Sequence, residues 1–180
     1  VTGGARDIGR AVSVKLASEG AKVVVNYFDN ESEANETVKL IENAGGEAIA
    51  VYADATNLED ISNLAKATTA AFGAKVDVLV NVAGGLFARK TISELDVDFY
   101  NLLMDVNFKS SVFVTQAFKP LMGKGASIIN FASQAARDGG GPGASLYAAS
   151  KAAVMTFTRA MAKEFGPEGI RVNALCPGMI

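Results

Sequence analysis

The stretch VTGGARDIGR, residues 1–10, decides the fold. A β-branched valine precedes a Thr-Gly-Gly turn, and the residues from Ile8 to Ser18 have the pattern of a helix. Such a turn directs backbone N–H groups and the positive end of a helix dipole at one spot. Glycine also permits close approach of the backbone to a ligand. The stretch therefore predicts a strand, a phosphate-holding loop and a helix in this order.

Asp7 places a negative charge inside this loop. Aspartate tolerates a positive φ better than most residues, and it is a preferred helix N-cap. We therefore expect Asp7 to cap the helix, with its carboxylate engaged by local N–H groups. The alternative is a tolerated substitution in a loop, and Arg6 and Arg10 flank it with positive charge.

Short apolar runs alternate with longer amphipathic runs along the rest of the chain. The expected strands are Lys22–Tyr27, Ala48–Tyr52, Val76–Asn81, Ser127–Ala132 and Arg171–Cys176. The expected helices are Ile8–Ser18, Glu31–Ala44, Leu58–Phe72, Phe99–Met122 and Leu146–Phe165. Apolar strands between helices are typical of a parallel sheet covered on both faces. We expect an α/β fold with a doubly wound, Rossmann-like sheet, forming one domain over residues 1–180. With Val1 ending a central strand, we expect this domain to be incomplete at both ends.

The composition narrows the chemistry. A net charge of −2 argues against a nucleic-acid or membrane-surface protein, both of which favour basic patches. The single cysteine, Cys176, fits a reducing compartment, so we expect a cytoplasmic protein. We expect Cys176 to be a small core residue that ends an apolar strand. The absence of histidine excludes every histidine-based triad, so acid–base chemistry falls to Tyr, Lys, Asp, Glu or Cys.

Four polar residues form a candidate catalytic set. Tyr147 and Lys151 lie four residues apart and share one helix face, although this pair alone is common on exposed helices. Ser133 follows an apolar strand, whose C-terminal end is where ligands bind in parallel sheets. Asn107 lies within a largely apolar helix, where a buried amide needs a partner.

This set, in its chain order, resembles the Asn–Ser–Tyr–Lys tetrad of the short-chain dehydrogenase/reductase family. Thr2, Gly3 and Gly9 match the family's TGxxxGxG loop, with Asp7 in place of the middle glycine. The resemblance extends over essentially the whole chain. It implies a cofactor site formed by Gly3, Arg6, Ile8, Gly9, Tyr27, Asp54, Ala55, Asn81, Ala83, Gly84, Tyr147, Lys151, Pro177, Gly178 and Ile180.

The resemblance also implies roles. Tyr147 is expected to be the general acid or base, and Lys151 to lower its pKa from about 10 while holding the nicotinamide ribose. Ser133 is expected to orient the substrate oxygen, and Asn107 to position a water that relays protons. The chemistry needs no metal, because a nicotinamide cofactor supplies the hydride.

The cofactor and substrate are less closely defined. Tyr27 stands where NAD-preferring relatives carry aspartate, and Arg6 lies where NADP-preferring relatives often carry a base, which favours NADP. Asp29 is close by and leaves NAD open. Residues 23–51 resemble 3-oxoacyl-carrier-protein reductases. The alternatives are an NAD-dependent sugar or polyol dehydrogenase and a catalytically silent dinucleotide-binding protein.

The expected partners are a small carbonyl or alcohol substrate and further copies of the chain. The Phe99–Met122 and Leu146–Phe165 helices carry more apolar residues than one sheet-facing stripe requires. Family members pair these two helices across a dimer interface, so we expect a homodimer or homotetramer.

Overall fold

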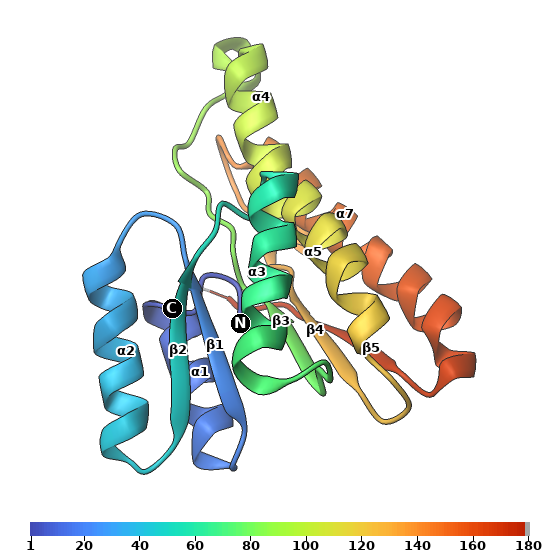
Figure 1. Ribbon diagram of the computed structural model, residues 1–180. Helices are drawn as coiled ribbons and strands as arrows, with labels where there is room; N and C mark the ends of the chain where they lie inside the picture. Colours follow the sequence, from blue (N-terminus) through green and yellow to red (C-terminus); the bar gives the residue numbers. More distant parts are fainter. Residues whose placement is uncertain (179–180) are drawn as a thin grey trace.

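The computed structural model describes residues 1–178 and contains parallel strands covered by helices (Figure 1). The strands are β1 (Lys22–Tyr27), β2 (Glu47–Tyr52), β3 (Val78–Asn81), β4 (Ser127–Phe131) and β5 (Arg171–Leu175). β1 pairs with β2, β3 with β4, and β4 with β5, each in parallel. The doubly wound α/β fold expected from the sequence is confirmed.

Val1 and Thr2 join the two groups of strands. The Asn26 N–H donates to Val1 O at 3.1 Å, and the Thr2 N–H donates to Val80 O at 2.9 Å. Thr2 also forms a parallel bridge with Asn81. The start of the chain therefore lies between β1 and β3, and the glycine loop leaves it at the C-terminal ends of both strands.

Helices cover both faces of the strands. They are α1 (Asp7–Ser18), α2 (Glu31–Asn43), α3 (Leu58–Phe72), α4 (Val97–Met104), α5 (Ser110–Phe118), α6 (Ala135–Asp138) and α7 (Ser145–Phe165). In Figure 1, α3, α5 and α7 lie on the near face, and α1, which contacts α2, lies behind. The described residues also contain three single 3₁₀ turns: η1 (Ile92–Glu94), η3 (Lys119–Leu121) and η4 (Gly166–Glu168).

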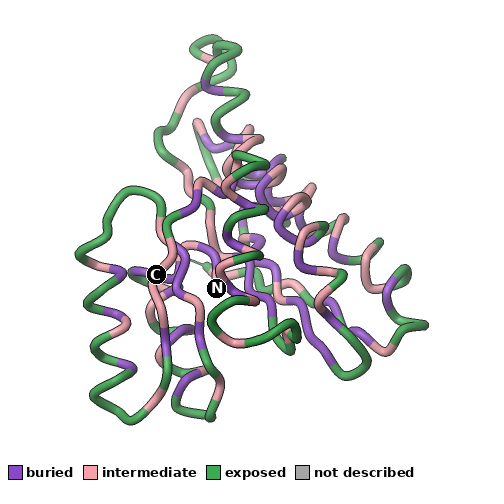
Figure 2. The backbone as a smooth tube through the Cα atoms, in the orientation of Figure 1, coloured by how far each residue is buried: buried purple, intermediate pink, exposed green. Residues whose placement is uncertain are grey.

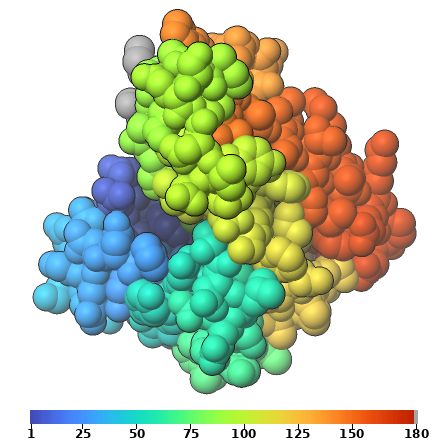
Figure 3. Space-filling view, turned by 90° about the horizontal axis from the view of Figure 1, so that it is seen from above, coloured from blue at the N-terminus to red at the C-terminus, as the bar shows by residue number. Residues whose placement is uncertain are grey.

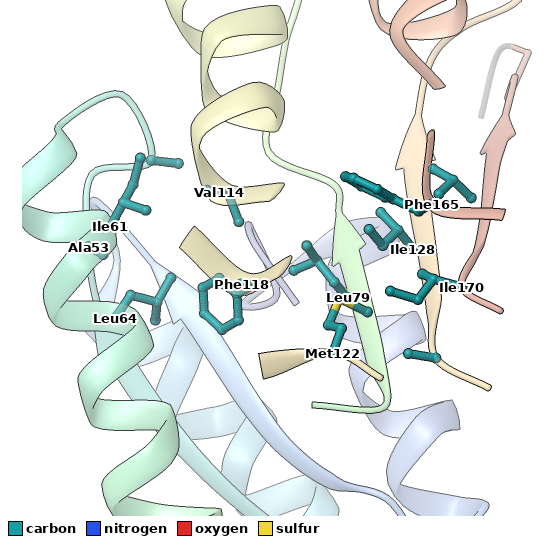
Figure 4. Packing of buried hydrophobic residues seen from close by; sticks show 13 residues of the cluster. Ala53, Ile61, Leu64, Leu79, Val114, Phe118, Met122, Ile128, Phe165 and Ile170 are labelled. Carbon is teal, nitrogen blue, oxygen red and sulfur yellow. The ribbon is translucent and has the colours of Figure 1, made fainter. Parts of the chain in front are cut away.

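The core between the strands and the near-face helices is aliphatic with phenylalanine at its centre (Figure 4). Phe118 of α5 packs in one cluster with Leu64 of α3, Leu79 of β3 and Ile128 of β4. Figure 2 shows that buried segments follow the strands and the inner sides of the helices. Burying each such side chain stabilises the fold by about 1.5–3 kcal/mol, which fixes the strand ends that carry the loops.

The expectation of one long helix over Phe99–Met122 is wrong in one respect. It is divided into α4, a π-helical turn over Asp105–Lys109 (η2), α5 and η3. The i to i+5 hydrogen bonds of a π turn widen the helix and frequently mark functional positions. The other expected helices and strands begin and end within two residues of the observed bounds.

Cys176 is exposed rather than buried, so the expectation of a core residue is wrong. It follows β5, the last strand of the described sheet, and Leu175 before it is 50% exposed. An apolar run predicts burial only where a further layer covers it. None of the helices in residues 1–178 is long and apolar enough to cross a bilayer.

Candidate active site

The glycine loop folds tightly onto the first turn of α1. Gly3 has a φ of +60°, and a β-carbon on Gly9 would lie 1.8 Å from Gly3 O. No side chain fits at position 9 without moving the loop backbone. The loop therefore requires glycine at both positions that match the family motif.

The N-terminus of α1 faces the same loop without a side-chain cap. The helix begins at Asp7, Arg6 occupies the N-cap position, and no side chain hydrogen-bonds the first turn. The expectation that Asp7 caps the helix is therefore wrong. Its φ of +48° shows instead why aspartate stands there: the position needs a left-handed residue. The first-turn N–H groups remain available to an anion.

The charge of Asp7 is only weakly offset. Its side chain is 81% exposed, and Asp7 Oδ2 lies 3.9 Å from Arg6 Nε. An exposed pair at this distance contributes little. Arg10 points elsewhere, because its guanidinium donates to Thr37 Oγ1 at 2.9 Å and to Glu36 Oε2 at 2.8 Å.

Two buried polar residues hold the loop in place: Thr2, which the sequence analysis matched to the loop motif, and Asn26, which it did not select. Asn26 of β1 accepts a hydrogen bond from Gly3 N at 3.3 Å, and its amide donates to Ala53 O at 3.0 Å. Thr2 Oγ1 accepts from Val82 N at 3.1 Å and from Ala83 N at 3.3 Å. A polar residue inside an apolar strand was the available signal, as in KVVVNY.

Asn107 lies in the π turn and is completely buried. Its Oδ1 accepts from Gly85 N and its Nδ2 donates to Gly85 O, both at 2.9 Å. The partner expected for a buried amide is therefore the loop that follows β3. This pair of bonds fixes Gly84 and Gly85 against the helix.

Lys151 of α7 is 4% exposed, and its Nζ donates to Phe131 O at the end of β4, at 2.8 Å. Burial lowers the pKa of its ammonium to about 8. The group is therefore mostly charged at neutral pH. Of its three N–H donors, one is used by Phe131, which leaves two for other partners among the groups of the site.

Ser133 and Tyr147 lie on either side of a short helix and a glycine-rich loop. Ser133 follows β4, and its Oγ accepts from Ala135 N at 3.1 Å at the start of α6. Tyr147 lies in the first turn of α7, one turn before Lys151. Both side chains are half-buried.

A cavity of about 700 Å³ connects these parts. In the view down onto the strand ends, the dark blue N-terminal segment is recessed between neighbouring elements (Figure 3). The predicted residues that line the cavity are Gly3, Arg6, Ile8, Gly9, Tyr27, Asp54, Ala55, Ala83, Gly84, Ser133, Tyr147, Lys151, Pro177 and Gly178.

Two of the predicted residues within the described part of the chain do not line it. Asn107 lies behind Gly85, as described above. Asn81 is buried below the cavity, where its Nδ2 donates to Asn130 Oδ1 at 2.8 Å. Ile180 lies outside the described residues.

The end of the cavity beside β1 carries mixed charge. Arg6, Asp29 and Glu33 all line it, and Glu33 Oε2 lies 3.9 Å from Arg6 Nε. Tyr27 closes the strand at this end. These three residues offer one cation and two carboxylates to a ligand. Their charges therefore give no clear preference between an anionic group and a hydroxyl group of the ligand.

The chain is similar to known proteins along its whole length. The family model described as short chain dehydrogenase matches residues 1–180. A 3-oxoacyl-[acyl-carrier-protein] reductase of Synechocystis sp. is 40% identical, over all of this chain and 72% of the relative.

Two solved structures are similar throughout and contain cofactors. A short chain dehydrogenase from Burkholderia cenocepacia J2315, in complex with NADP, is 36% identical with a TM-score of 0.94, over 99% of this chain and 72% of that one. An NADH-dependent reductase, A1-R′, complexed with NAD, is 34% identical with a TM-score of 0.93, over 99% of this chain and 76% of that one.

Proposed function

The chain belongs to the short-chain dehydrogenase/reductase family and is an NAD(P)-dependent oxidoreductase, and we propose that it transfers a hydride between NADP(H) and a carbonyl or secondary alcohol. The observation that carries the proposal is the single cavity that joins the glycine loop to Ser133, Tyr147 and Lys151. A 3-oxoacyl thioester is one candidate substrate, supported by the reductase that is 40% identical.

The residues present fit a dinucleotide. The uncapped first turn of α1 offers N–H donors to a pyrophosphate, and the crowding of Gly9 against Gly3 keeps side chains out of that space. Lys151 and Tyr147 line the same cavity, and Lys151 would hold the nicotinamide ribose. When bound, the reduced dinucleotide supplies a hydride to the carbonyl carbon and is thereby oxidised.

Tyr147 gives the proton that the carbonyl oxygen needs in reduction and takes it back in oxidation. Lys151, one helical turn away, places a positive charge on the same side of α7. Ser133 donates a hydrogen bond to the substrate oxygen and orients it. Asn107 holds the Gly84–Gly85 segment that forms the wall behind them, and its remaining hydrogen-bonding capacity serves a proton-relaying water.

NADP(H) is the preferred cofactor in this proposal. Arg6 supports it, because a 2′-phosphate needs a cation at this end of the cavity. Asp29 and Glu33 support the second candidate, an NAD-dependent sugar or polyol dehydrogenase, because a carboxylate can accept from the ribose 2′-hydroxyl. Titrating NADPH and NADH separately into the wild-type protein and Arg6→Gln distinguishes the two, since only NADPH binding should weaken in the variant.

The proposed assembly is a homodimer or homotetramer formed through α4, α5 and α7. Val97 and Tyr100 of α4 are 72% and 50% exposed and do not line the cavity, which supports a further partner on this side. Light scattering at micromolar concentration should report a mass of at least twice the 18.7 kDa of the chain. A monomer there refutes the assembly.

The test of the function is oxidation of NADPH or NADH with a panel of carbonyl compounds, with Tyr147→Phe as the matched control. Turnover by the wild type and its loss in the variant support the proposal. A protein that binds cofactor but turns over none of the panel is instead a silent dinucleotide-binding protein.

A further inference from the structure

Phe87 lies at the centre of an unusual turn. Its φ is +58°, and the Ala88 N–H donates to Leu86 O, two residues back, at 2.7 Å. A hydrogen bond of this span around a positive central φ is a γ-turn of the rarer and more strained form. A bulky aromatic residue with a positive φ is an outlier that needs a reason.

The turn is fixed on both sides, so it cannot relax freely. On the near side, Gly85 is bonded through N–H and C=O to Asn107. On the far side, the Lys90 N–H donates to Gly143 O at 3.0 Å, and Arg89 Nη1 donates to Pro142 O at 2.9 Å. Asn107 of the π turn and the glycine-rich loop before α7 therefore hold the segment around Phe87 from its two sides.

The Phe87 ring gains little burial from this strained backbone. It is 57% exposed, and one edge lies against Gly85, 3.4 Å from where a β-carbon would be. The ring lines the same cavity as Ser133 and Tyr147. Fixed strain and an open aromatic face in a cavity point to a contact that residues 1–178 do not supply.

The surroundings define the chemistry of that contact. Leu102, Val106 and Phe131 line the cavity as well, and they are apolar. Apart from Lys151, the charged residues lining the described cavity come from the glycine loop, the ends of β1 and β2, and the start of α2: Arg6, Asp7, Asp29, Glu33 and Asp54. The wall near Phe87 therefore suits an uncharged, flat, apolar group.

We propose that Phe87 is a specificity-determining residue whose ring stacks on an aromatic ring of the substrate, so that the preferred substrates are aryl ketones and aryl carbinols. This rests on the proposed function. The reaction is unchanged: the ketone carbon gains the hydride and its oxygen the Tyr147 proton, while the aromatic ring only binds. Stacking of two rings orients the carbonyl and adds to the free energy gained by apolar burial.

The first test compares 1-tetralone with 1-decalone, two bicyclic ketones of similar size that differ in the aromatic ring. The ratio of their kcat/KM values is measured in wild type, Phe87→Leu and Phe87→Tyr. We expect the tetralone preference to fall about two- to tenfold in Phe87→Leu, as for a lost aromatic pair, and to return in Phe87→Tyr. Comparing ratios removes the intrinsic difference in reactivity between the two ketones.

The second test measures binding without turnover. Fluorescence anisotropy of 2-naphthol is followed with the oxidised cofactor present, and decahydro-2-naphthol is the saturated competitor. Wild type and Phe87→Tyr should bind 2-naphthol at least about twofold more tightly than Phe87→Leu, while the competitor should show no such difference. Thermal melts establish that all three proteins are folded.

The outcomes are distinguishable. If all three proteins reduce both ketones with the same ratio, the role of Phe87 is refuted and the proposed function stands. If the folded wild type reduces no carbonyl compound, the proposed function fails first, and the naphthol titration still reports on Phe87.

Discussion

Asn107 and Lys151 approach one glycine from two different helices. A β-carbon on Gly84 would lie 2.7 Å from Asn107 Oδ1 and 2.7 Å from Lys151 Nζ. Each side chain is held by a backbone partner, Gly85 for the amide and Phe131 for the ammonium. Gly84 therefore sets how closely the loop after β3 can approach α7.

Gly84→Ala should displace the tip of Lys151 or the amide of Asn107. Both atoms are side-chain ends, and alanine is also strained at the φ of +158° of Gly84. We expect a stability loss of about 1–3 kcal/mol and a fall in turnover of roughly a hundredfold, as for a misplacement near 1 Å. Gly123→Ala is the control, since its β-carbon would meet no atom within 4 Å. Urea unfolding and steady-state kinetics on both variants measure the two effects, and equal turnover in the two variants contradicts the argument.

Tyr147→Phe removes the phenol hydroxyl group, the proposed proton donor, and keeps the aromatic ring. Turnover should fall by at least about a hundredfold, in line with the loss of a general acid, while the affinity for cofactor measured by fluorescence titration changes little. Activity within about tenfold of wild type, which is 1.4 kcal/mol, would show that another group transfers the proton.

The lowered pKa of Lys151 predicts a pH-dependent stability. Burial lowers the pKa from its ordinary 10.5 to about 8. Below pH 8 both the folded and the unfolded chain hold this proton, and the full penalty for burying the charge is present. Between the two values only the unfolded chain holds it, so the free energy of unfolding gains about 3 kcal/mol as the pH rises through this window.

Lys151→Met should lack that gain. Urea unfolding of both proteins is measured at several pH values from about pH 7 to about pH 10. For each protein this gives the slope of the free energy of unfolding against pH. The difference between the two slopes separates the contribution of Lys151 from that of other titrating groups. Parallel slopes would mean that Lys151 keeps an ordinary pKa in the folded state.

Thr158 connects α7 to the strands. Its Oγ1 accepts from Asn130 Nδ2 at 2.9 Å, and both residues are buried. Thr158→Val should destabilise the protein by about 1–3 kcal/mol, because it leaves a buried amide donor without its acceptor. Thr158→Ser keeps the oxygen and should lose only about 0.8 kcal/mol for the methyl group. Chemical denaturation measures the free energy of unfolding of both variants. If Thr158→Ser is less stable than Thr158→Val, the stabilising role of this hydrogen bond is refuted.

Asp7→Asn should strengthen cofactor binding. The exposed carboxylate caps nothing in the structure, and asparagine also tolerates a positive φ. We expect NADP(H) affinity to rise about two- to tenfold at low salt, and less at high salt where the repulsion is screened. The melting temperature should stay constant.

Asp77→Asn is the matched control for Asp7→Asn. It removes one exposed negative charge outside the cavity, beside Lys75. The same gain in affinity in this variant would assign the effect to net charge, and a lower melting temperature of Asp7→Asn with unchanged affinity would restore the capping role.

The sequence was sufficient to predict the order of strands and helices, because each strand is a short apolar run and each helix an amphipathic one. The spacing of Tyr147 and Lys151 likewise predicted that both face one cavity. Their catalytic roles remain predictions until the variants above are measured.

The contacts that depend on tertiary approach were not predictable in this way. Asn107 lies in the π turn and its amide reaches the loop at Gly85, and nothing in the sequence between positions 99 and 122 specifies that partner. Asn26 and Thr2 bind backbone groups of neighbouring segments. Asp7 and Phe87 both have positive φ angles, but in neither case does the residue type alone require one.

The π turn over Asp105–Lys109 also makes the exact number of residues between α4 and α5 matter. A π turn closes with one residue more than an α-helical turn, so deleting one residue here would restore regular winding with little change in the orientation of α4 against α5. The deletion would instead remove the widened turn in which Asn107 reaches Gly85. Inserting a residue has a different consequence, because an α-helix turns by about 100° per residue and Phe99 and Leu103, which α4 buries, would swing towards solvent. Loss of one residue should therefore leave the fold intact and disturb the loop after β3, whereas gain of one residue should destabilise the protein.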